Sequence, residues 1–332
     1  MGGKQVSART FLTLNSDRTE VPDASLSALQ DRMRGEVIGP DGAGYDACRT
    51  LWNTMIDRRP TCIARCLGAA DVIAAVGFAR EFDLLCSVRG GGHNVAGKAV
   101  ADDTLMIDLS PMQDIRVDPS RERARVGAGC LWSAVDAETQ AFGLATTGGT
   151  VSHTGVAGLT LGGGIGWLGS MYGLTCDNLV SVDLVTASGE YLRVDADEYP
   201  DLFSDSLIDV LIEQNEKRPT PESPQLLFRM HGQMNEIPVS ATAFPQRRDG
   251  WDYDVIAQWT EPQKAEPCIA WARETWDAVS PHTDGVYINH LDHDDDARIR
   301  SAYGPNYGRL VDVKRKYDAD NFFRLNNNIP PD

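Results

Sequence analysis

Apolar and polar positions follow a strand-helix-strand order in the part of the chain that begins near residue 61. A short apolar run at 62–66 precedes a helical stretch, 69–82, in which Ile73 and Phe78 share one mostly apolar face, and a second apolar run follows at 84–88. Helical spacing flanked by two short apolar runs is typical of a β-α-β unit. We therefore predict that residues 62–88 form such a unit.

Further elements follow from the same patterns. Helical spacing predicts helices at 131–142, 262–279 and 305–317. Short β-favouring runs predict strands at 104–109, 115–118, 123–126, 179–187, 191–194, 225–230, 239–244, 253–259 and 285–291. The first 35 residues show little apolar periodicity, so we expect them to form a loosely held extension.

Two segments stand out by their glycine content. The first, Arg89-Gly90-Gly91-Gly92-His93-Asn94, directly follows the second strand of the β-α-β unit. The second, 148–173, reads GGTVSHTGVAGLTLGGGIGWLGSMYG, a density that disfavours any helix or strand interior. Glycine lets backbone N–H groups approach an anion or lie along a flat ring system. The pair of loops therefore predicts a site for an extended dinucleotide.

A nicotinamide or FAD site of the Rossmann type is the first alternative to weigh. Residues 164–169, GIGWLG, match the GxGxxG pattern literally. The match lacks a clear strand on one side and an amphipathic helix on the other, and Asp183 lies closer than the expected acidic residue. We reject the Rossmann interpretation.

Composition and charge narrow the class of protein. The chain has 332 residues, 42% of them hydrophobic, and a formal net charge of −17, which would repel a phosphate backbone. We therefore expect neither nucleic acid nor a membrane as a partner, and a cytoplasmic location. Seven cysteines without a CxxC pair indicate neither a zinc site nor a disulfide framework.

Four motifs, in order along the chain, resemble one known family. They are SVRGGGHNVAG (87–97), GVAGLTLGGGIGWL (155–168), YGLTCDNL (172–179) and YGPNYGRLVDVKRKYDADNFFRLNNNI (303–329). Together they closely resemble the berberine-bridge-enzyme-like oxidoreductases, which carry the FAD-binding domain of the vanillyl-alcohol-oxidase type, also called PCMH-type. The resemblance runs from about residue 36 to residue 330.

The resemblance implies an α+β fold and a division of the chain. It predicts an N-terminal extension at 1–35, a PCMH-type FAD-binding domain of two α+β subdomains at 36–203, and a shortened substrate domain at 204–302. This second domain should be an antiparallel sheet with helices on one face. The C-terminal segment, 303–332, should return to the FAD-binding domain.

The resemblance also implies FAD attached at two points. The His of GGGHN, here His93, would bond the 8α-methyl carbon of the flavin, and the Cys of YGLTCDN, here Cys176, would bond flavin C6. Two attachments should raise the electron affinity of the ring and hold it in an open cleft. The remaining residues expected to bind the cofactor are Arg89, Gly90, Gly91, Gly92, Asn94, Gly148, Gly149, Thr150, Gly155, Gly158, Gly162, Gly163, Gly164, Gly166, Trp167, Val182, Asn326 and Asn328.

Catalytic residues are inferred from the same resemblance. Relatives take hydride from a C–H bond while a base removes a proton from an adjacent hydroxyl or amine. Their flavin-facing strand carries Tyr-x-Asn, here Tyr287 and Asn289, and we predict Tyr287 as the base or as a hydroxyl that orients the substrate. His290 departs from the aromatic residue common in relatives, and His153 is a further residue near the predicted cofactor.

One departure from the family bears on activity. Relatives continue after the DLF motif, here 201–203, with a tryptophan and another glycine-rich segment, whereas this chain runs directly into Ser204-Asp205-Ser206. More than a hundred residues of the substrate domain are therefore expected to be missing. We predict an FAD-dependent oxidation of a carbohydrate, alcohol or secondary metabolite, with oxygen or another electron acceptor and with self-association of the exposed sheet. The alternative is a shortened relative that binds flavin without catalysis.

Overall fold

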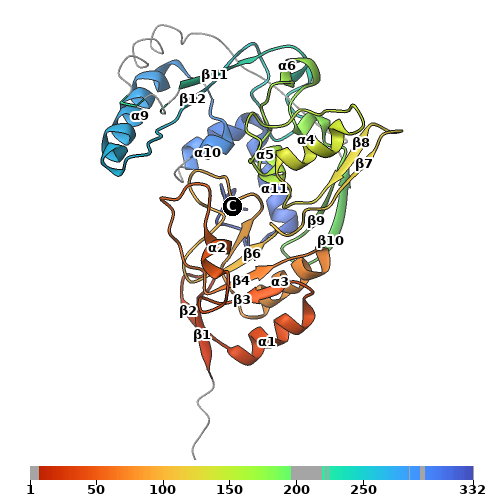
Figure 1. Ribbon diagram of the computed structural model, residues 1–332, viewed down its shortest axis with the longest axis vertical. Helices are drawn as coiled ribbons and strands as arrows, with labels where there is room; N and C mark the ends of the chain where they lie inside the picture. The colour runs from red at the N-terminus through yellow and green to blue at the C-terminus, as the bar shows by residue number, and fades with distance from the viewer. Residues whose placement is uncertain are drawn as a thin grey trace, which may run out of the picture.

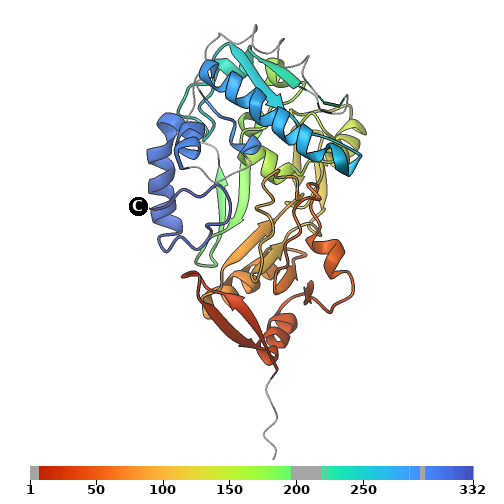
Figure 2. The same ribbon diagram turned by 90° about the vertical axis from the view of Figure 1, so that its left-hand side faces the viewer.

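The computed structural model describes residues 7–195, 219–220, 223, 225–283, 285–291 and 296–331. It has the predicted mixture of helices and sheets. Figures 1 and 2 show an elongated molecule, with the N-terminal elements at one end and β11, β12 and α9 at the other. None of the described helices is long and apolar enough to cross a lipid bilayer. The predicted boundary near 203 lies outside the described residues.

A four-stranded sheet forms the centre of the N-terminal half. Its order is β3 (Glu36–Ile38), β4 (Cys62–Arg65), β6 (Leu105–Asp108) and β5 (Cys86–Arg89). β4 and β5 each pair with β6 in parallel, and α3 (Ala69–Glu81) connects them. The predicted β-α-β unit is confirmed, although Ile73 is 37% exposed and the buried face of α3 runs through Phe78 instead.

The N-terminal residues correct one expectation. Instead of a loosely held extension, residues from Ala8 form a hairpin, β1 (Ala8–Leu12) with β2 (Arg18–Pro22), and the helix α1 (Asp23–Arg32). Phe11, Val21 and Leu29 are fully buried in the same apolar cluster as β4, α3 and β6. A few apolar residues are enough to hold the N-terminal elements in place, because each one fills a position in the core of the neighbouring sheet.

Most of the elements predicted between 104 and 194 are confirmed. A hairpin of β7 (Ile115–Asp118) and β8 (Arg123–Val126) precedes α4 (Trp132–Gln140), and β9 (Ser181–Val185) pairs with β10 (Tyr191–Asp195). The short helix α2 (Tyr45–Arg49) lies in the loop that joins β3 to β4. These elements carry the two glycine-rich loops and fix where they begin and end.

The second glycine-rich segment contains short helices, contrary to our expectation. They are α5 (Val156–Leu161) and α6 (Gly169–Tyr172), and the 3-10 turn η1 (Cys176–Asn178) follows shortly after the segment. Each of these helices has six residues or fewer. The conformational entropy that glycine loses in a helix therefore applies to only a few residues. Inside α5, a Cβ atom on Gly158 would meet nothing within 4 Å, so this glycine is not required by a close approach.

The second region is smaller and differs in several elements from the prediction. β11 (Gln225–Met230) pairs antiparallel with β12 (Gly250–Val255), which begins and ends earlier than the predicted strand at 253–259. The predicted helix is confirmed as η2 (Pro262–Lys264) followed by α9 (Ala265–Val279). Two short helices, α8 (Gln233–Glu236) and η3 (Ser280–His282), complete the region.

Two predicted strands are absent from the described residues of this region. Residues 239–244 form turns, since the amide of Asn306 donates to the backbone carbonyls of Val239 and Thr242 and holds them close together. Residues 285–291 contain the 3-10 turn η4 (Ile288–His290), and Asn327 donates to the Ile288 carbonyl. In both places, side-chain amides donate to backbone carbonyls that would bond a neighbouring strand in a sheet.

The last part of the chain lies against the N-terminal half. After α10 (Asp296–Tyr303) come η5 (Gly304–Asn306) and α11 (Tyr307–Tyr317), followed by an extended stretch. Phe322 is fully buried in the cluster around α3, and the Arg324 guanidinium donates to the Leu14 carbonyl at 2.7 Å. The end of the chain therefore packs against its beginning.

Candidate functional site

The first glycine-rich loop begins where β5 ends at Arg89. A Cβ atom on Gly91 would lie 2.4 Å from the Cα of Gly155, and one on Gly155 would lie 2.7 Å from the Cα of Gly91. Gly92 adopts φ 65°, a conformation that a side chain disfavours. The two predicted loops therefore touch backbone to backbone, which only glycine at both positions permits.

His93 leaves this loop in a defined orientation. Its Nε2 lies 2.9 Å from Nδ1 of His153, and its ring stacks on Trp52 with centroids 4.6 Å apart. Burial, and secondarily the neighbouring His153, lowers the pKa of His93 to about 4. The imidazole is therefore neutral at pH 7 and carries an unprotonated nitrogen, which is the form that acts as a nucleophile.

Several buried polar atoms around the loops have no hydrogen-bond partner in the protein. They are Ser87 Oγ at the end of β5, Arg89 Nε, Thr147 Oγ1 before the second loop, and Asn328 Oδ1 in the returning C-terminal segment. Buried polar atoms without partners cost free energy, and a bound polar group would supply the missing bonds. The donors and acceptors fit a cofactor such as FAD, which offers phosphate, hydroxyl and amide groups.

The second loop is packed so closely that its glycines are needed. A Cβ on Gly148 would lie 2.6 Å from the ring of Trp132, and one on Gly166 would lie 1.7 Å from the Gly148 carbonyl oxygen. Gly163 and Gly164 have φ of 118° and 87°. These glycines fold the loop back on itself.

Cys176 lies near the C-terminal end of α5, whereas Gly155, which touches the first loop, precedes its N-terminal end. Its N–H donates to the Gly163 carbonyl at 2.9 Å, and its thiol donates to Asp177 Oδ1 at 3.6 Å. Burial, with the adjacent Asp177 carboxylate, raises the pKa of this thiol to about 12. The thiol is protonated at pH 7, so Cys176 is a weaker nucleophile than His93 in this conformation.

A buried ion pair next to Cys176 was not predicted. The two terminal nitrogens of the Arg247 guanidinium, Nη1 and Nη2, donate to the Asp177 carboxylate at 2.7 and 2.6 Å. Both side chains are almost fully buried. Arg247 also approaches the Cys176 sulfur at 3.8 Å. No local pattern marks this contact, because the two residues lie 70 positions apart.

Tyr287 and Asn289 lie against the second loop. The Tyr287 hydroxyl accepts a hydrogen bond from the Gly164 N–H at 2.9 Å and another from the Asn289 amide at 2.8 Å. A Cβ on Gly162 would lie 2.0 Å from Asn289 Oδ1. Burial raises the pKa of Tyr287 well above its usual value, so its phenol is neutral and a poor base at pH 7.

The asparagines of the C-terminal segment are placed differently from one another. Asn326 is exposed, whereas Asn328 has the buried, unpartnered oxygen noted above. Asn327, which the sequence did not single out, accepts from the Lys98 ammonium at 2.9 Å. Lys98 follows the first loop, so this bond joins the loop to the returning segment.

The other predicted residues divide into two groups. Asn94 accepts from the Lys98 N–H and stabilises the first loop, and Thr150 and Gly149 lie in the second loop beside its contacts. Trp167 is 74% exposed and touches Phe228 edge-on, and Val182 is half-buried on β9. The structure brings the loop residues together and leaves Trp167 at the surface.

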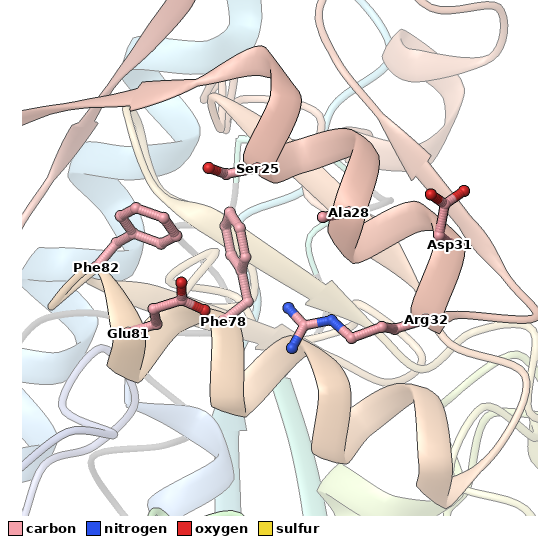
Figure 3. A pocket seen from close by; sticks show the side chains of 7 residues that line it. All are labelled: Ser25, Ala28, Asp31, Arg32, Phe78, Glu81 and Phe82. Carbon is pink, nitrogen blue, oxygen red and sulfur yellow. The ribbon is translucent and has the colours of Figure 1, made fainter.

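One cavity lies outside this site. It has a volume of about 430 Å³ and is lined by residues of α1 and α3 and by Phe82, as Figure 3 shows. None of its lining residues belongs to the predicted site. We assign it no role in cofactor binding.

Comparison with known proteins also indicates an FAD-binding domain. Residues 60–195 match the family model described as FAD binding domain, and residues 286–330 match the one described as Berberine and berberine like. The chain is 42% identical to (R)-6-hydroxynicotine oxidase of Paenarthrobacter nicotinovorans over 171 residues, which are 52% of this chain and 37% of that protein. It is 34% identical to an uncharacterised FAD-linked oxidoreductase of Bacillus subtilis over 52% of this chain and 39% of that one. The matched part thus spans about two fifths of these relatives.

Solved structures share the fold. 6-Hydroxy-D-nicotine oxidase from Arthrobacter nicotinovorans superimposes with a TM-score of 0.69 at 23% identity, covering 90% of this chain and 98% of that one. The grass pollen allergen Phl p 4, described as having glucose dehydrogenase activity, gives 0.76 at 15% identity, covering 92% and 99%. Both family models match in order around this glycine-lined site, so the chain carries a match to an FAD binding domain followed by a berberine-like segment, and its relatives include FAD-linked oxidoreductases.

Proposed function

We propose that this protein is an FAD-dependent oxidoreductase that removes hydride from a carbohydrate, an alcohol or a secondary metabolite. The observation that carries the proposal is the direct contact of the two glycine-rich loops at Gly91 and Gly155, beside a neutral His93. The relatives' names, a hydroxynicotine oxidase and a glucose dehydrogenase, span this range of substrates. When bound, FAD supplies the hydride acceptor.

His93 is the first attachment point in this proposal. Its ring is neutral at pH 7 and is held between His153 and Trp52, so one face and one nitrogen keep a fixed direction. A fixed, unprotonated imidazole nitrogen would supply the electron pair for a bond to the 8α carbon. A C–H bond of that carbon would break, its proton would be lost, and the two electrons would pass to the flavin ring and from there to oxygen or another acceptor.

Cys176 is the second attachment point. The high pKa of its thiol means that this bond forms only when its proton can leave, and Asp177 is the acceptor closest to it. The nearby Arg247 guanidinium favours the thiolate. We therefore expect the bond at His93 to form before the bond at Cys176.

Tyr287 serves to orient groups rather than to remove a proton. Its hydroxyl holds Gly164 and Asn289 and keeps its own proton, which it can donate to a substrate or cofactor oxygen. This favours the substrate-orienting alternative over the base. Reoxidation would use oxygen or another small electron acceptor.

A second candidate function is flavin binding without turnover. The second region has a two-stranded sheet, β11–β12, and large apolar side chains are exposed nearby, including Trp167, Met171 and Leu227. Such a sheet covers little of a substrate, and its open edges favour self-association.

One experiment separates the two functions. The protein is produced with FAD, its flavin content is measured after acid precipitation, and size-exclusion chromatography is followed by flavin absorbance. Anaerobic bleaching is then recorded with a panel of sugars, alcohols and hydroxylated N-heterocycles. Bleaching of protein-bound flavin by one class supports the oxidoreductase. Bound flavin that no substrate bleaches, but that dithionite does, supports the non-catalytic relative, and protein without any flavin contradicts both.

A further inference from the structure

Three metal-binding side chains gather in the second region, apart from the glycine-rich loops. Asp252 and Asp254 lie two residues apart on β12, so both point to the same face of the hairpin. His290 reaches them from the turn η4, 36 residues further along the chain than Asp254. One donor atom from each lies within 4.8 Å of the other two.

The face that carries these carboxylates is an inward one. Asp252 pairs across the hairpin with Phe228, and the same face carries Met230, which is 3% exposed in the apolar cluster around Phe244 and Tyr287. Carboxylates are disfavoured beside such a cluster unless something neutralises them.

The internal contacts leave one ligand atom without a partner. His290 Nδ1 lies 2.5 Å from Asp254 Oδ1, which accounts for one carboxylate. Asp252 Oδ2 is buried and has no hydrogen-bond partner. His290 therefore accounts for Asp254, and Asp252 Oδ2 is left as a buried oxygen that no donor of the described residues reaches.

The three metal-binding side chains are held in place, and solvent can reach them. The ring of His290 packs edge-on against Tyr287 with centroids 4.5 Å apart, and Tyr287 is fixed by its bonds to Gly164 and Asn289. The His290 side chain keeps 38% exposure, whereas that of Asp254 keeps 14%. A small ion could enter from solvent on the His290 side and meet the carboxylates behind it.

We propose that Asp252, Asp254 and His290 bind one divalent transition-metal cation, with water completing its coordination. Two carboxylates and one imidazole suit Mn²⁺ or Zn²⁺, whereas Mg²⁺ and Ca²⁺ prefer oxygen ligands alone. Binding replaces the Nδ1 proton shared with Asp254 by the cation, and that proton moves to Nε2 or to water.

The cation would act as a clamp between two parts of the chain. Two ligands belong to β12 and the third to the segment that leads into α10 and the returning C-terminus. Figure 1 shows β12 beside β11 and near α9, at the end of the molecule opposite the N-terminal hairpin, and among the described strands these two pair only with each other. A metal bridge would stabilise this hairpin where neighbouring strands do not.

The test is a titration of the untagged, EDTA-treated full chain with Mn²⁺, followed by loss of the free-ion EPR signal. Mn²⁺ avoids the thiols that would also bind Zn²⁺. We expect one Mn²⁺ per chain, displaced by one equivalent of Zn²⁺. Asp252→Asn and His290→Gln should each weaken binding about tenfold or more.

Two matched variants control for charge and for imidazole. Asp249→Asn removes an exposed carboxylate just before β12 that pairs with Arg229, and His282→Gln removes an exposed imidazole from η3. Both should bind Mn²⁺ as the wild type does. Equal binding by wild type and Asp252→Asn, or no binding by wild type at millimolar Mn²⁺, would overturn the proposal.

Thermal unfolding guards against a folding artefact. Without metal, Asp252→Asn should melt at or above the wild-type midpoint, because it removes an unpaired buried charge. Added Mn²⁺ should raise the midpoint of the wild type and leave that of Asp252→Asn unchanged. A metal-free Asp252→Asn that melts well below the wild type would show that Asp252 has a structural partner in the protein and would contradict the metal assignment.

Discussion

The sheet β3-β4-β6-β5 has strands of three or four residues and the hairpin β11–β12 has strands of six, yet the shorter strands are the better buried. Every residue of β6 is buried, and α3, the N-terminal hairpin and Phe322 supply its neighbours. In β11–β12, Leu227 is 43% exposed and Trp251 39%, and no further strand of the described residues joins either edge. Parallel strands need cover on both faces, whereas a lone hairpin is marginal without it.

The difference indicates that the N-terminal half has a well-packed core and that the hairpin of the second region is packed on one side only. The first glycine-rich loop follows β5, which is buried in the core of the four-stranded sheet. The second loop packs in smaller clusters. One surrounds Trp132, and in the other Ile165 meets Met230 and Phe244 of the second region. The first loop should therefore keep its arrangement when order in the hairpin is lost.

The largest expected effect compares a fully buried residue of the N-terminal half with a partly exposed residue of the hairpin. Phe11→Ala should lower the free energy of unfolding by about 3–5 kcal/mol, because it empties a fully buried position under the sheet. Leu227→Ala on the hairpin should change it by less than about 0.5 kcal/mol. Urea unfolding followed by tryptophan fluorescence measures both, and equal losses would show that the hairpin is as tightly packed as the sheet.

The next effect concerns the buried ion pair. Arg247→Met leaves the Asp177 carboxylate unpaired and should cost about 3–5 kcal/mol. Adding Asp177→Leu to the same chain removes that charge and should restore most of the loss. If the double variant is no more stable than Arg247→Met alone, the pair is not the contact that holds the two halves together here.

A smaller effect is expected at Tyr287. Tyr287→Phe leaves the Gly164 N–H and the Asn289 amide without their acceptor, which should cost about 1–3 kcal/mol and slow anaerobic flavin reduction. Tyr253→Phe, which removes the hydroxyl bound to Gln225, is the matched control on the hairpin and should leave flavin reduction unchanged. Unaltered reduction in Tyr287→Phe would restrict this residue to a structural role.

Local patterns predicted the elements but not the contacts between distant residues. The β-α-β unit and α9 were predictable because apolar spacing alone specifies them. The N-terminal hairpin was missed because Phe11 and Val21 acquire their partners only in the folded core. The Lys98–Asn327 bond joins residues 229 positions apart, and no local pattern marks either of them.

Part of the candidate site could also be predicted from the sequence. The glycines of both loops were identified because their density is extreme, and the structure gives most of them a close contact that excludes a side chain. Neither the protonation of His93 and Cys176 nor the role of His153 follows from sequence, because burial and a single 2.9 Å contact determine them.

The central claim is that His93 and Cys176 hold FAD covalently in an intact binding half. The most direct measurement is the intact mass of the denatured chain after production with FAD. The wild type, Cys176→Ala and, more slowly, His93→Ala should each carry the mass of one FAD, and the double variant should carry none. A wild-type mass equal to that of the bare polypeptide would contradict the account.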